Sequence, residues 1–197
     1  KPHLFMYTGA PSGVKITRVG YCGGTTSNPT YRKVCGDPAY NDWAECVQVD
    51  FDETELSYED LCRHFLKSHE PSVSGSSRQY QSFIFAHGEK QFEAASKVIN
   101  GGSFRQSVST AVEHATDFYE AELYHQKWLL QKSPWFRRLK IMQSRDLVEG
   151  KAASKFNAFV GGYVSATEMR LYTAQWVEEG AIEQETYERL GLYLDKS

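Results

Sequence analysis

Residues 13–20, GVKITRVG, carry the clearest periodic pattern in the chain and lead directly into its most irregular segment. Val14, Ile16 and, less regularly, Val19 alternate with polar residues, which is typical of a half-buried strand. Residues 20–35, GYCGGTTSNPTYRKVC, follow at once. Their paired glycines and Asn-Pro step predict an irregular backbone, and functional sites are often built on such loops. The segment therefore predicts a strand that ends in a loop suited to hold a site.

Strand and helix patterns alternate through the first two thirds of the chain, and the remainder is helical. Further strands are predicted at 44–51, 82–86 and 107–115. Helices are predicted from Ser57 to the His69-Glu70-Pro71 stop, at 89–99, at 121–131, from Pro134 onward, at 165–179 and at 182–190. This order predicts an α+β (two-layer α/β) domain in which helices pack on a mixed sheet. We expect this domain at residues 1–149 and a helical C-terminal extension at residues 150–197.

Composition and charge fit one globular domain. The chain has 197 residues, of which 41% are hydrophobic and 24% are charged, and this length can bury a sizeable core. The formal net charge of -3 gives no electrostatic reason to expect nucleic acid or a membrane as a partner, and the short basic cluster Arg137, Arg138 and Lys140 suits a solvated helix face. No apolar run approaches the roughly 20 residues that span a bilayer, and the first residues lack the layout of a signal peptide. We expect a monomer in the cytoplasm, with the mitochondrion as the alternative.

The four cysteines are Cys22, Cys35, Cys46 and Cys62, at spacings of 13, 11 and 16 residues. No CxxC pair occurs, so the spacing does not favour a structural zinc site. An even count allows two disulfides, but free thiols in a reducing compartment are the simpler interpretation. We expect no metal and no other cofactor.

Several short motifs become informative when their order is considered. Alone, each tyrosine could be a packing residue and each glutamate an exposed charge. Together, GYCGG at 20–24, NPTY at 28–31, AE at 44–45, QYQS at 79–82 and FYEAELYHQ at 118–126 resemble, in order and spacing, the motifs of type A methionine sulfoxide reductases. The resemblance covers about residues 13–132, and the helical tail weakly resembles that of an animal subgroup.

The resemblance implies reduction of the S epimer of methionine sulfoxide, free or in proteins, to methionine. In that chemistry a thiolate attacks the sulfoxide sulfur, an acid protonates the oxygen, and an aromatic pocket holds the ε-methyl group. By resemblance, Glu45 would be the acid, and Tyr21 and Tyr80 would donate hydrogen bonds to the oxygen, with Tyr124 also at the substrate. The thiol would become a sulfenic acid, which thioredoxin or another dithiol would reduce. A carboxylic acid serves near neutral pH when it is buried, and a place on a strand between apolar neighbours is consistent with burial.

The chain also departs from the family pattern. The family nucleophile lies in GCFWG, and counting back from the shared GVxxTxVGY pattern places that cysteine just before Lys1, with Lys-Pro-His at 1–3 in place of the aromatic residues. Because no initiator methionine is present, we expect that the chain begins inside a longer product. Trp43 replaces a histidine, the loop at Pro71–Arg78 is shortened and lacks an aspartate, and no cysteine follows Cys62.

The cysteines that are present differ as substitutes for the nucleophile. Cys46 and Cys62 fall on predicted buried faces. Cys22 lies nearest the predicted site, but it has no evident helix N-terminus or cation to lower its thiol pKa. Cys35, in a predicted loop beside the basic residues 32–33, is a possible redox thiol, as is Cys22.

Two hypotheses about the function follow. In one, the chain is part of an ordinary reductase. In the other, it is a pseudo-reductase that binds methionine sulfoxide peptides or has a structural role. Under either hypothesis we expect little or no sulfoxide reduction by the chain as it stands, because no thiolate is predicted to face the acid.

Overall fold

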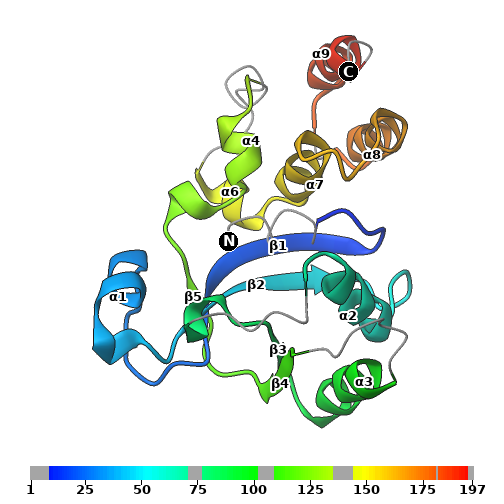
Figure 1. Ribbon diagram of the computed structural model, residues 1–197. Coiled ribbons are helices and arrows are strands. Elements are labelled where there is room, and N and C mark those ends of the chain that lie inside the picture. The colour runs from blue at the N-terminus through cyan, green and yellow to red at the C-terminus, as the bar shows by residue number, and fades with distance from the viewer. Residues whose placement is uncertain (1–8, 71–76, 102–108, 135–143, 181, 195–197) are drawn as a thin grey trace.

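The computed structural model describes residues 9–70, 77–101, 109–134, 144–180 and 182–194 (Figure 1). Its strands are β1 (Val14–Cys22), β2 (Ala44–Phe51), β3 (Phe83–Ala86), β4 (Ala111–His114) and β5 (Tyr119–Glu120). Its helices are α1 (Tyr31–Gly36), α2 (Tyr58–Lys67), α3 (Glu89–Asn100), α4 (Trp128–Lys132), α6 (Ser144–Glu149), α7 (Lys151–Val160), α8 (Ala166–Glu178) and α9 (Gln184–Leu194). Short 3-10 turns are η2 (Pro38–Tyr40), η3 (Arg78–Tyr80) and η4 (Leu123–His125).

β1 is the centre of an antiparallel sheet with the order β2-β1-β5, and β3 pairs in parallel with β4. The predicted α+β class is confirmed, although the predicted single mixed sheet is divided in two. In the β1–β2 ladder Tyr21 lies opposite Glu45, and Gly20 lies opposite Cys46. Because side chains alternate between the faces of a strand, Tyr21 and Glu45 share one face, and Cys22 and Cys46 share the other.

The predicted helices on the β3 side form where their caps and apolar stripes indicate. The Ser57 hydroxyl oxygen accepts a hydrogen bond from the Asp60 amide at 3.1 Å and starts α2, as expected for an N-cap. α2 and α3 lie side by side below the larger sheet (Figure 1). Their inner faces share a hydrophobic cluster with β3: Cys62, Leu66, Ile84, Ala95 and Val98.

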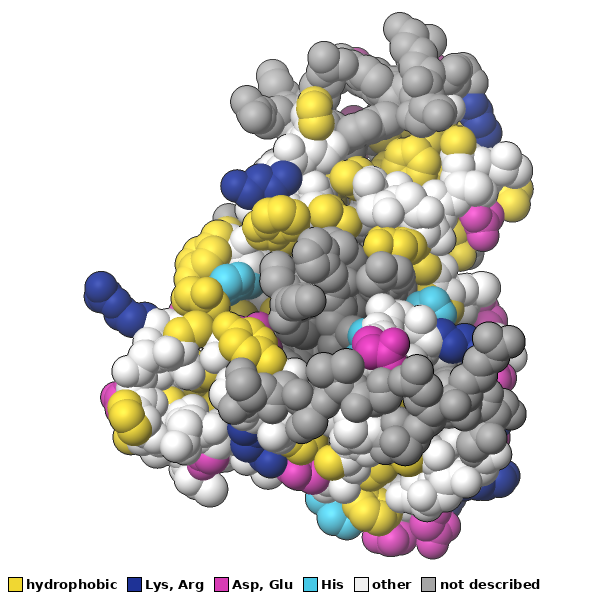
Figure 2. All heavy atoms as spheres, in the orientation of Figure 1, with side chains coloured by type: hydrophobic (Ala, Val, Ile, Leu, Met, Phe, Trp, Pro, Cys, Tyr) yellow, Lys and Arg dark blue, Asp and Glu magenta, His cyan; other side chains and the backbone are white. Residues whose placement is uncertain are grey.

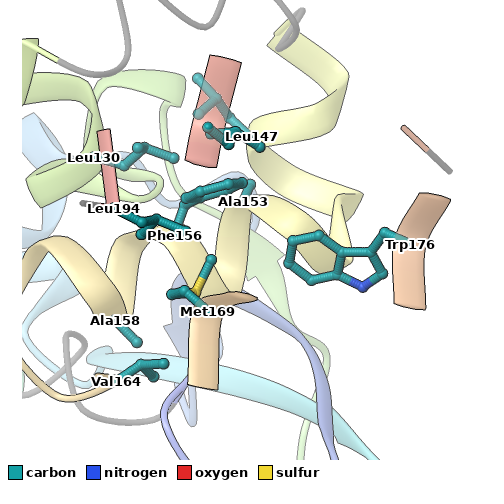
Figure 3. Packing of buried hydrophobic residues seen from close by; sticks show 10 residues of the cluster. Leu130, Leu147, Ala153, Phe156, Ala158, Val164, Met169, Trp176 and Leu194 are labelled. Carbon is teal, nitrogen blue, oxygen red and sulfur yellow. The ribbon is translucent and has the colours of Figure 1, made fainter. Parts of the chain in front are cut away.

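The C-terminal helices build the largest hydrophobic cluster and pack against β1. Ser154 of α7 accepts a hydrogen bond from the Thr17 amide of β1 at 3.1 Å. Phe156 lies between Leu147 and Met169 in this cluster (Figure 3). The cluster also includes Leu130, so its packing crosses the predicted boundary at residue 150. α8 lies within the helix predicted at 165–179 and begins with a complete capping box formed by residues 165 and 168.

One predicted helix, at 121–131, is wrong. The segment instead contains η4, an interruption at Gln126 and Lys127, and the short α4. The buried Gln126 side chain accepts from the Val19 amide at 2.9 Å and donates to the Val19 carbonyl at 2.7 Å. Lys127 adopts a left-handed backbone with φ of 45°. The side chain of Gln126 therefore continues the edge pairing of β1, and the helix cannot run through it.

Other differences are smaller. The segment expected to be irregular at 20–35 contains α1, whose N-cap Thr30 accepts a hydrogen bond from the Lys33 amide. The strand predicted at 107–115 is confirmed at Ala111–His114. The helix predicted after Pro134, the basic cluster at 137–140 and most of the loop at 71–78 lie outside the described residues. Within the described part of the chain, no helix combines the length and the apolar character needed to cross a membrane.

Candidate active site

Glycines let the irregular loop and strand β5 pack closely on β1. A Cβ at Gly24 would lie 2.2 Å from the Trp43 ring, and a Cβ at Gly20 would lie 2.4 Å from both Phe118 and Tyr119. Trp43 is 1% exposed and donates its indole N–H to the Thr26 hydroxyl at 2.8 Å. The tryptophan that departs from the family motif therefore anchors the loop. These contacts fix the turn that carries the chain from β1 to Tyr31.

One cavity of about 220 Å³ receives side chains from both sides of this turn. Tyr21, Glu45 and Tyr80, which the motifs predict as site residues, all line it. Tyr124 does not belong to the lining; its ring packs on that of His125, with centroids 4.2 Å apart. The other lining residues in the described part of the chain are Thr17, Val19, Gly20, Tyr31, Ala121, His125, Lys127, Trp128 and Asn157.

Gln79 of η3 donates a hydrogen bond to the carboxyl group of Glu45. The Gln79 amide nitrogen lies 2.6 Å from Glu45 Oε1 and 3.0 Å from the sulfur of Cys35. Gln79 is buried, and its neighbour Arg78 fixes the turn by a two-pronged ion pair with Glu113 at 3.0 and 2.5 Å. An arginine–carboxylate pair of this kind is geometrically demanding, so η3 presents Gln79 in a defined position.

Two exposed phenols line the same cavity as this acid. Tyr31 and Tyr80 are 41% and 49% exposed. A hydrogen bond with Cys35 raises the pKa of Tyr31, and the nearby Glu45 carboxylate adds to the effect. Burial of part of its ring raises the pKa of Tyr80, with further contributions from Glu45 and Cys35. Both hydroxyls are therefore protonated near neutral pH and can donate hydrogen bonds.

The Tyr21 hydroxyl does not have the free position that the motif resemblance predicts for it. It is 1% exposed, and its hydroxyl donates to Glu122 Oε2 at 3.1 Å. Burial, followed by the charge of Glu122, raises the pKa of Tyr21. Because the single hydroxyl hydrogen is engaged by Glu122, Tyr21 does not offer it to the cavity in this structure. Tyr31 of the NPTY motif lines the cavity but is not among the predicted site residues, because the motifs alone do not show which tyrosine faces the cavity.

Aromatic and apolar side chains surround the cavity mouth. Among the exposed large hydrophobic residues are Tyr31, Tyr80, Leu123, Tyr124 and Trp128. Figure 2 shows hydrophobic side chains, with a histidine among them, running from the region of α4 toward α1. The Tyr31 and His125 rings lie 4.9 Å apart.

His125 itself presents an unsatisfied polar atom. Its Nε2 is buried, lies 3.9 Å from Glu122 Oε2, and has no hydrogen-bond partner within the described part of the chain. Because His125 lines the cavity, this nitrogen adds a polar group to a wall that already holds the Glu45 carboxyl group and the hydroxyl groups of Tyr31 and Tyr80.

The four cysteines differ in how far they are exposed to solvent. Cys22 and Cys62 are buried, Cys46 is partly buried, and Cys35 is exposed. Cys22, Cys46 and Cys62 line a second cavity of about 180 Å³. A hydrogen bond with the Cys46 thiol lowers the pKa of Cys22 to about 6, with further help from Thr116. The cause is therefore neither a helix N-terminus nor a cation, the two sources that the sequence was searched for.

Cys35 lies in α1 rather than in a loop. The neighbouring Lys33 donates to the Asn28 carbonyl at 2.9 Å instead of facing the thiol. Within the described residues, no group of three or more His, Cys, Asp or Glu side chains could hold a metal ion.

Known proteins are similar in sequence to the part of the chain that forms this site. The family model described as peptide methionine sulfoxide reductase matches residues 5–156. The peptide methionine sulfoxide reductase MsrA of Methanothermobacter thermautotrophicus is 41% identical over 131 residues, which are 62% of this chain and 76% of that protein. The peptide methionine sulfoxide reductase of Drosophila melanogaster is 32% identical over 158 residues, which are 78% of this chain and 62% of that protein.

Solved structures share the fold. The reduced form of Mxr1 from Saccharomyces cerevisiae superposes with a TM-score of 0.57 at 26% identity, over 68% of this chain and 80% of that one. Methionine sulfoxide reductase A of Corynebacterium diphtheriae gives a TM-score of 0.51 at 31% identity, over 62% of this chain and 65% of that one. Because the family model covers well over half of the sequence, the chain belongs to the peptide methionine sulfoxide reductase family.

Proposed function

We propose that this chain binds methionine sulfoxide, free or at the surface of proteins, in the 220 Å³ cavity and takes part in its reduction to methionine. The observation that carries the proposal is the joint placement of one carboxyl group, Glu45, and two protonated phenols, Tyr31 and Tyr80, around one cavity. A sulfoxide oxygen becomes more basic as its sulfur is attacked, and donors placed in advance stabilise that charge.

Each residue has a role that follows from its position. Glu45 delivers the proton to the sulfoxide oxygen as a general acid, and Gln79 fixes the direction of its carboxyl group. Tyr31 and Tyr80 donate hydrogen bonds to the same oxygen. Trp128, which lines the cavity and is 41% exposed, offers an aromatic face to the ε-methyl group.

The two other predicted tyrosines receive different roles. Tyr21 supports the wall through Glu122 rather than contacting the oxygen. Tyr124, which is 56% exposed at the mouth, contacts the peptide that carries the sulfoxide.

The remaining features belong to the same proposal. The family nucleophile precedes residue 1 in the longer protein, as the spacing of the motifs indicates. The chain is of the animal type; in support, the match to the Drosophila relative extends over 78% of the chain. A dithiol such as thioredoxin recycles the enzyme, which acts as a monomer in the cytoplasm or the mitochondrion.

A restored nucleophile tests this function. A Gly-Cys-Phe-Trp segment placed ahead of residue 4 should give turnover of methionine S-sulfoxide with dithiothreitol, because the acid and the donors are already positioned. In that protein Glu45→Gln should lower the rate about 10²–10⁴-fold, the range for a general acid. Tyr80→Phe should lower it less, since Tyr31 still donates. A grafted protein that folds, has a titratable thiol and turns over nothing would contradict the proposal and favour a binding protein without activity.

A further inference from the structure

The second cavity, of about 180 Å³, lies between β2 and the layer that contains α2 and β3. Its described lining is rich in aromatic rings, which belong to Phe51, Tyr58, Phe65, Phe83, Phe85 and Phe118. Gln81, His87 and Thr116 also line it and are exposed, so the cavity opens to solvent. An apolar cavity of about 150 Å³ admits a molecule the size of benzene. The second cavity can therefore take a small apolar molecule from solution.

Cys22 lies in the wall of this cavity, and hydrogen-bond donors surround its sulfur. The Thr116 hydroxyl oxygen accepts from the Gly23 amide at 2.9 Å and lies 3.6 Å from the Cys22 sulfur, so its own hydrogen is available to that sulfur. Cys46 also lines the cavity and lies diagonally across the β1–β2 ladder from Cys22, on the same face. Its thiol donates a second hydrogen bond to the Cys22 sulfur.

These contacts separate the three cavity thiols by ionisation. The hydrogen bond from Cys46, with help from Thr116, outweighs burial and lowers the pKa of Cys22 to about 6. The same hydrogen bond, together with burial, raises the pKa of Cys46, and burial raises the pKa of Cys62 to about 11. Near neutral pH the Cys22 thiol is therefore ionised while the other two keep their protons, and a thiolate is the nucleophilic form of cysteine.

We propose that the second cavity is a covalent binding site for small apolar electrophiles, in which the Cys22 sulfur adds to an α,β-unsaturated aldehyde or ketone held among the aromatic rings. The apolar lining selects the body of such a molecule, and the sulfur in the wall selects its electrophilic carbon. The inference does not rest on the proposed function, because it involves neither a sulfoxide nor the 220 Å³ cavity.

The addition balances without an oxidant or a reductant. The Cys22 thiolate forms a bond from its sulfur to the β-carbon, the carbon–carbon double bond opens, and the negative charge moves to the carbonyl oxygen as an enolate. A proton from water then goes to the α-carbon, which leaves a thioether and a saturated carbonyl compound. The Cys46 thiol keeps its proton, because its pKa is raised.

Two other cysteines show what the cavity adds to the reaction. Cys35 is exposed and is not among the residues that line this cavity, so it reports access from solvent without an apolar site. Cys62 lines the same cavity but stays protonated, so it reports the cavity without a thiolate. If exposure alone decided the reaction, Cys35 would be modified first; if the cavity and its thiolate decide it, Cys22 would be.

Labelling with two electrophiles distinguishes these cases. The full chain is incubated at pH 7 with trans-2-hexenal, which is apolar, or with iodoacetate, which is charged. After borohydride reduction of the aldehyde, the modified cysteines are identified over time by mass spectrometry of peptides. We expect hexenal on Cys22 first, roughly 50-fold faster than on Cys62 once the weaker nucleophilicity of the more acidic thiol is allowed for, and iodoacetate on Cys35 first. Benzene should slow the hexenal reaction at Cys22 and leave that at Cys35 unchanged.

Two variants complete the experiment. Cys22→Ser should lose the cavity adduct and keep the modification of Cys35, and Cys62→Ser should leave the rate at Cys22 unchanged. The benzene comparison needs no variant, so it decides the question even if a substitution impairs folding. Hexenal on Cys35 before Cys22, iodoacetate on Cys22 before Cys35, or no protection of Cys22 by benzene would overturn the inference.

Discussion

Glu122 connects the two segments that carry the motif tyrosines. Its Oε2 accepts from the Tyr21 hydroxyl at 3.1 Å, and its Oε1 accepts from the Tyr31 amide at 2.9 Å. The ring of His125, three residues on, lies against Tyr31. A single carboxylate therefore fixes the start of α1 to β1 and sets the position of the Tyr31 ring.

Substitution of Glu122 tests this role. Glu122→Gln keeps the shape but removes the charge and one acceptor, so unfolding free energy should fall by about 1.5–3 kcal/mol, as for hydrogen bonds to a charged group. Sulfoxide affinity should fall as well, because Tyr31 loses its anchor. Chemical denaturation and NMR titration measure the two effects, with the exposed Glu120→Gln as the control. Unchanged affinity in a stably folded Glu122→Gln protein would contradict the positioning role.

Elements outside the sheet complete the edge of β1. The Gln126 side chain pairs with Val19, and the Lys127 ammonium donates to the carbonyls of Thr17 and Leu147. The helix predicted at 121–131 rests on the spacing of apolar residues alone. It cannot reveal that two polar side chains are needed to satisfy backbone groups of a strand more than a hundred residues away, and that need overrides the local preference.

The buried Lys127 predicts a pH dependence of stability. Burial lowers the pKa of Lys127 from 10.5 to about 7. Between those values the unfolded chain binds more protons at this site than the folded one, so stability should rise with pH, with a limiting slope of about 1.4 kcal/mol per pH unit. Below pH 7 the full penalty of the buried charge applies.

The effect is isolated by comparing unfolding free energies of the original protein and Lys127→Met from pH 6 to 9. The unfolding free energy of the original protein should increase relative to that of Lys127→Met across pH 7–9. The same substitution at the exposed Lys151 of α7 controls for the loss of a lysine in general. A difference that stays constant or shrinks with rising pH would show that Lys127 is charged in the fold throughout this range.

At the scale of the molecule, the sequence predicted strands β1 to β4 and helices α2, α3, α8 and α9 near their observed bounds, because alternation and caps act locally, whereas α1 and β5 were not expected. Ser57 and Ser165 begin their helices as expected. The division into two sheets was not predictable, since it depends on which strand edges meet. Packing of the tail on β1 was also hidden, because it rests on contacts such as that of Ser154 with Thr17.

The candidate site was partly predictable for a related reason. Motif order selected Tyr21, Glu45 and Tyr80 from three distant segments, and all three line one cavity. The sequence did not distinguish the buried Tyr21 from Tyr31, because that difference depends on Glu122. It also did not place Cys35 beside Gln79, because α1 was not expected.

The central claim is that this cavity recognises a sulfoxide through Glu45 and the two phenols. The most direct measurement is an NMR titration of the chain with N-acetyl-methionine S-sulfoxide, labelled at the ε-methyl carbon, beside the matching thioether. We predict saturable binding of the sulfoxide, much weaker binding of the thioether, and loss of that preference in Glu45→Gln and in the Tyr31→Phe, Tyr80→Phe double variant. Equal binding of both ligands, or a sulfoxide preference that survives in both variants, would contradict the account.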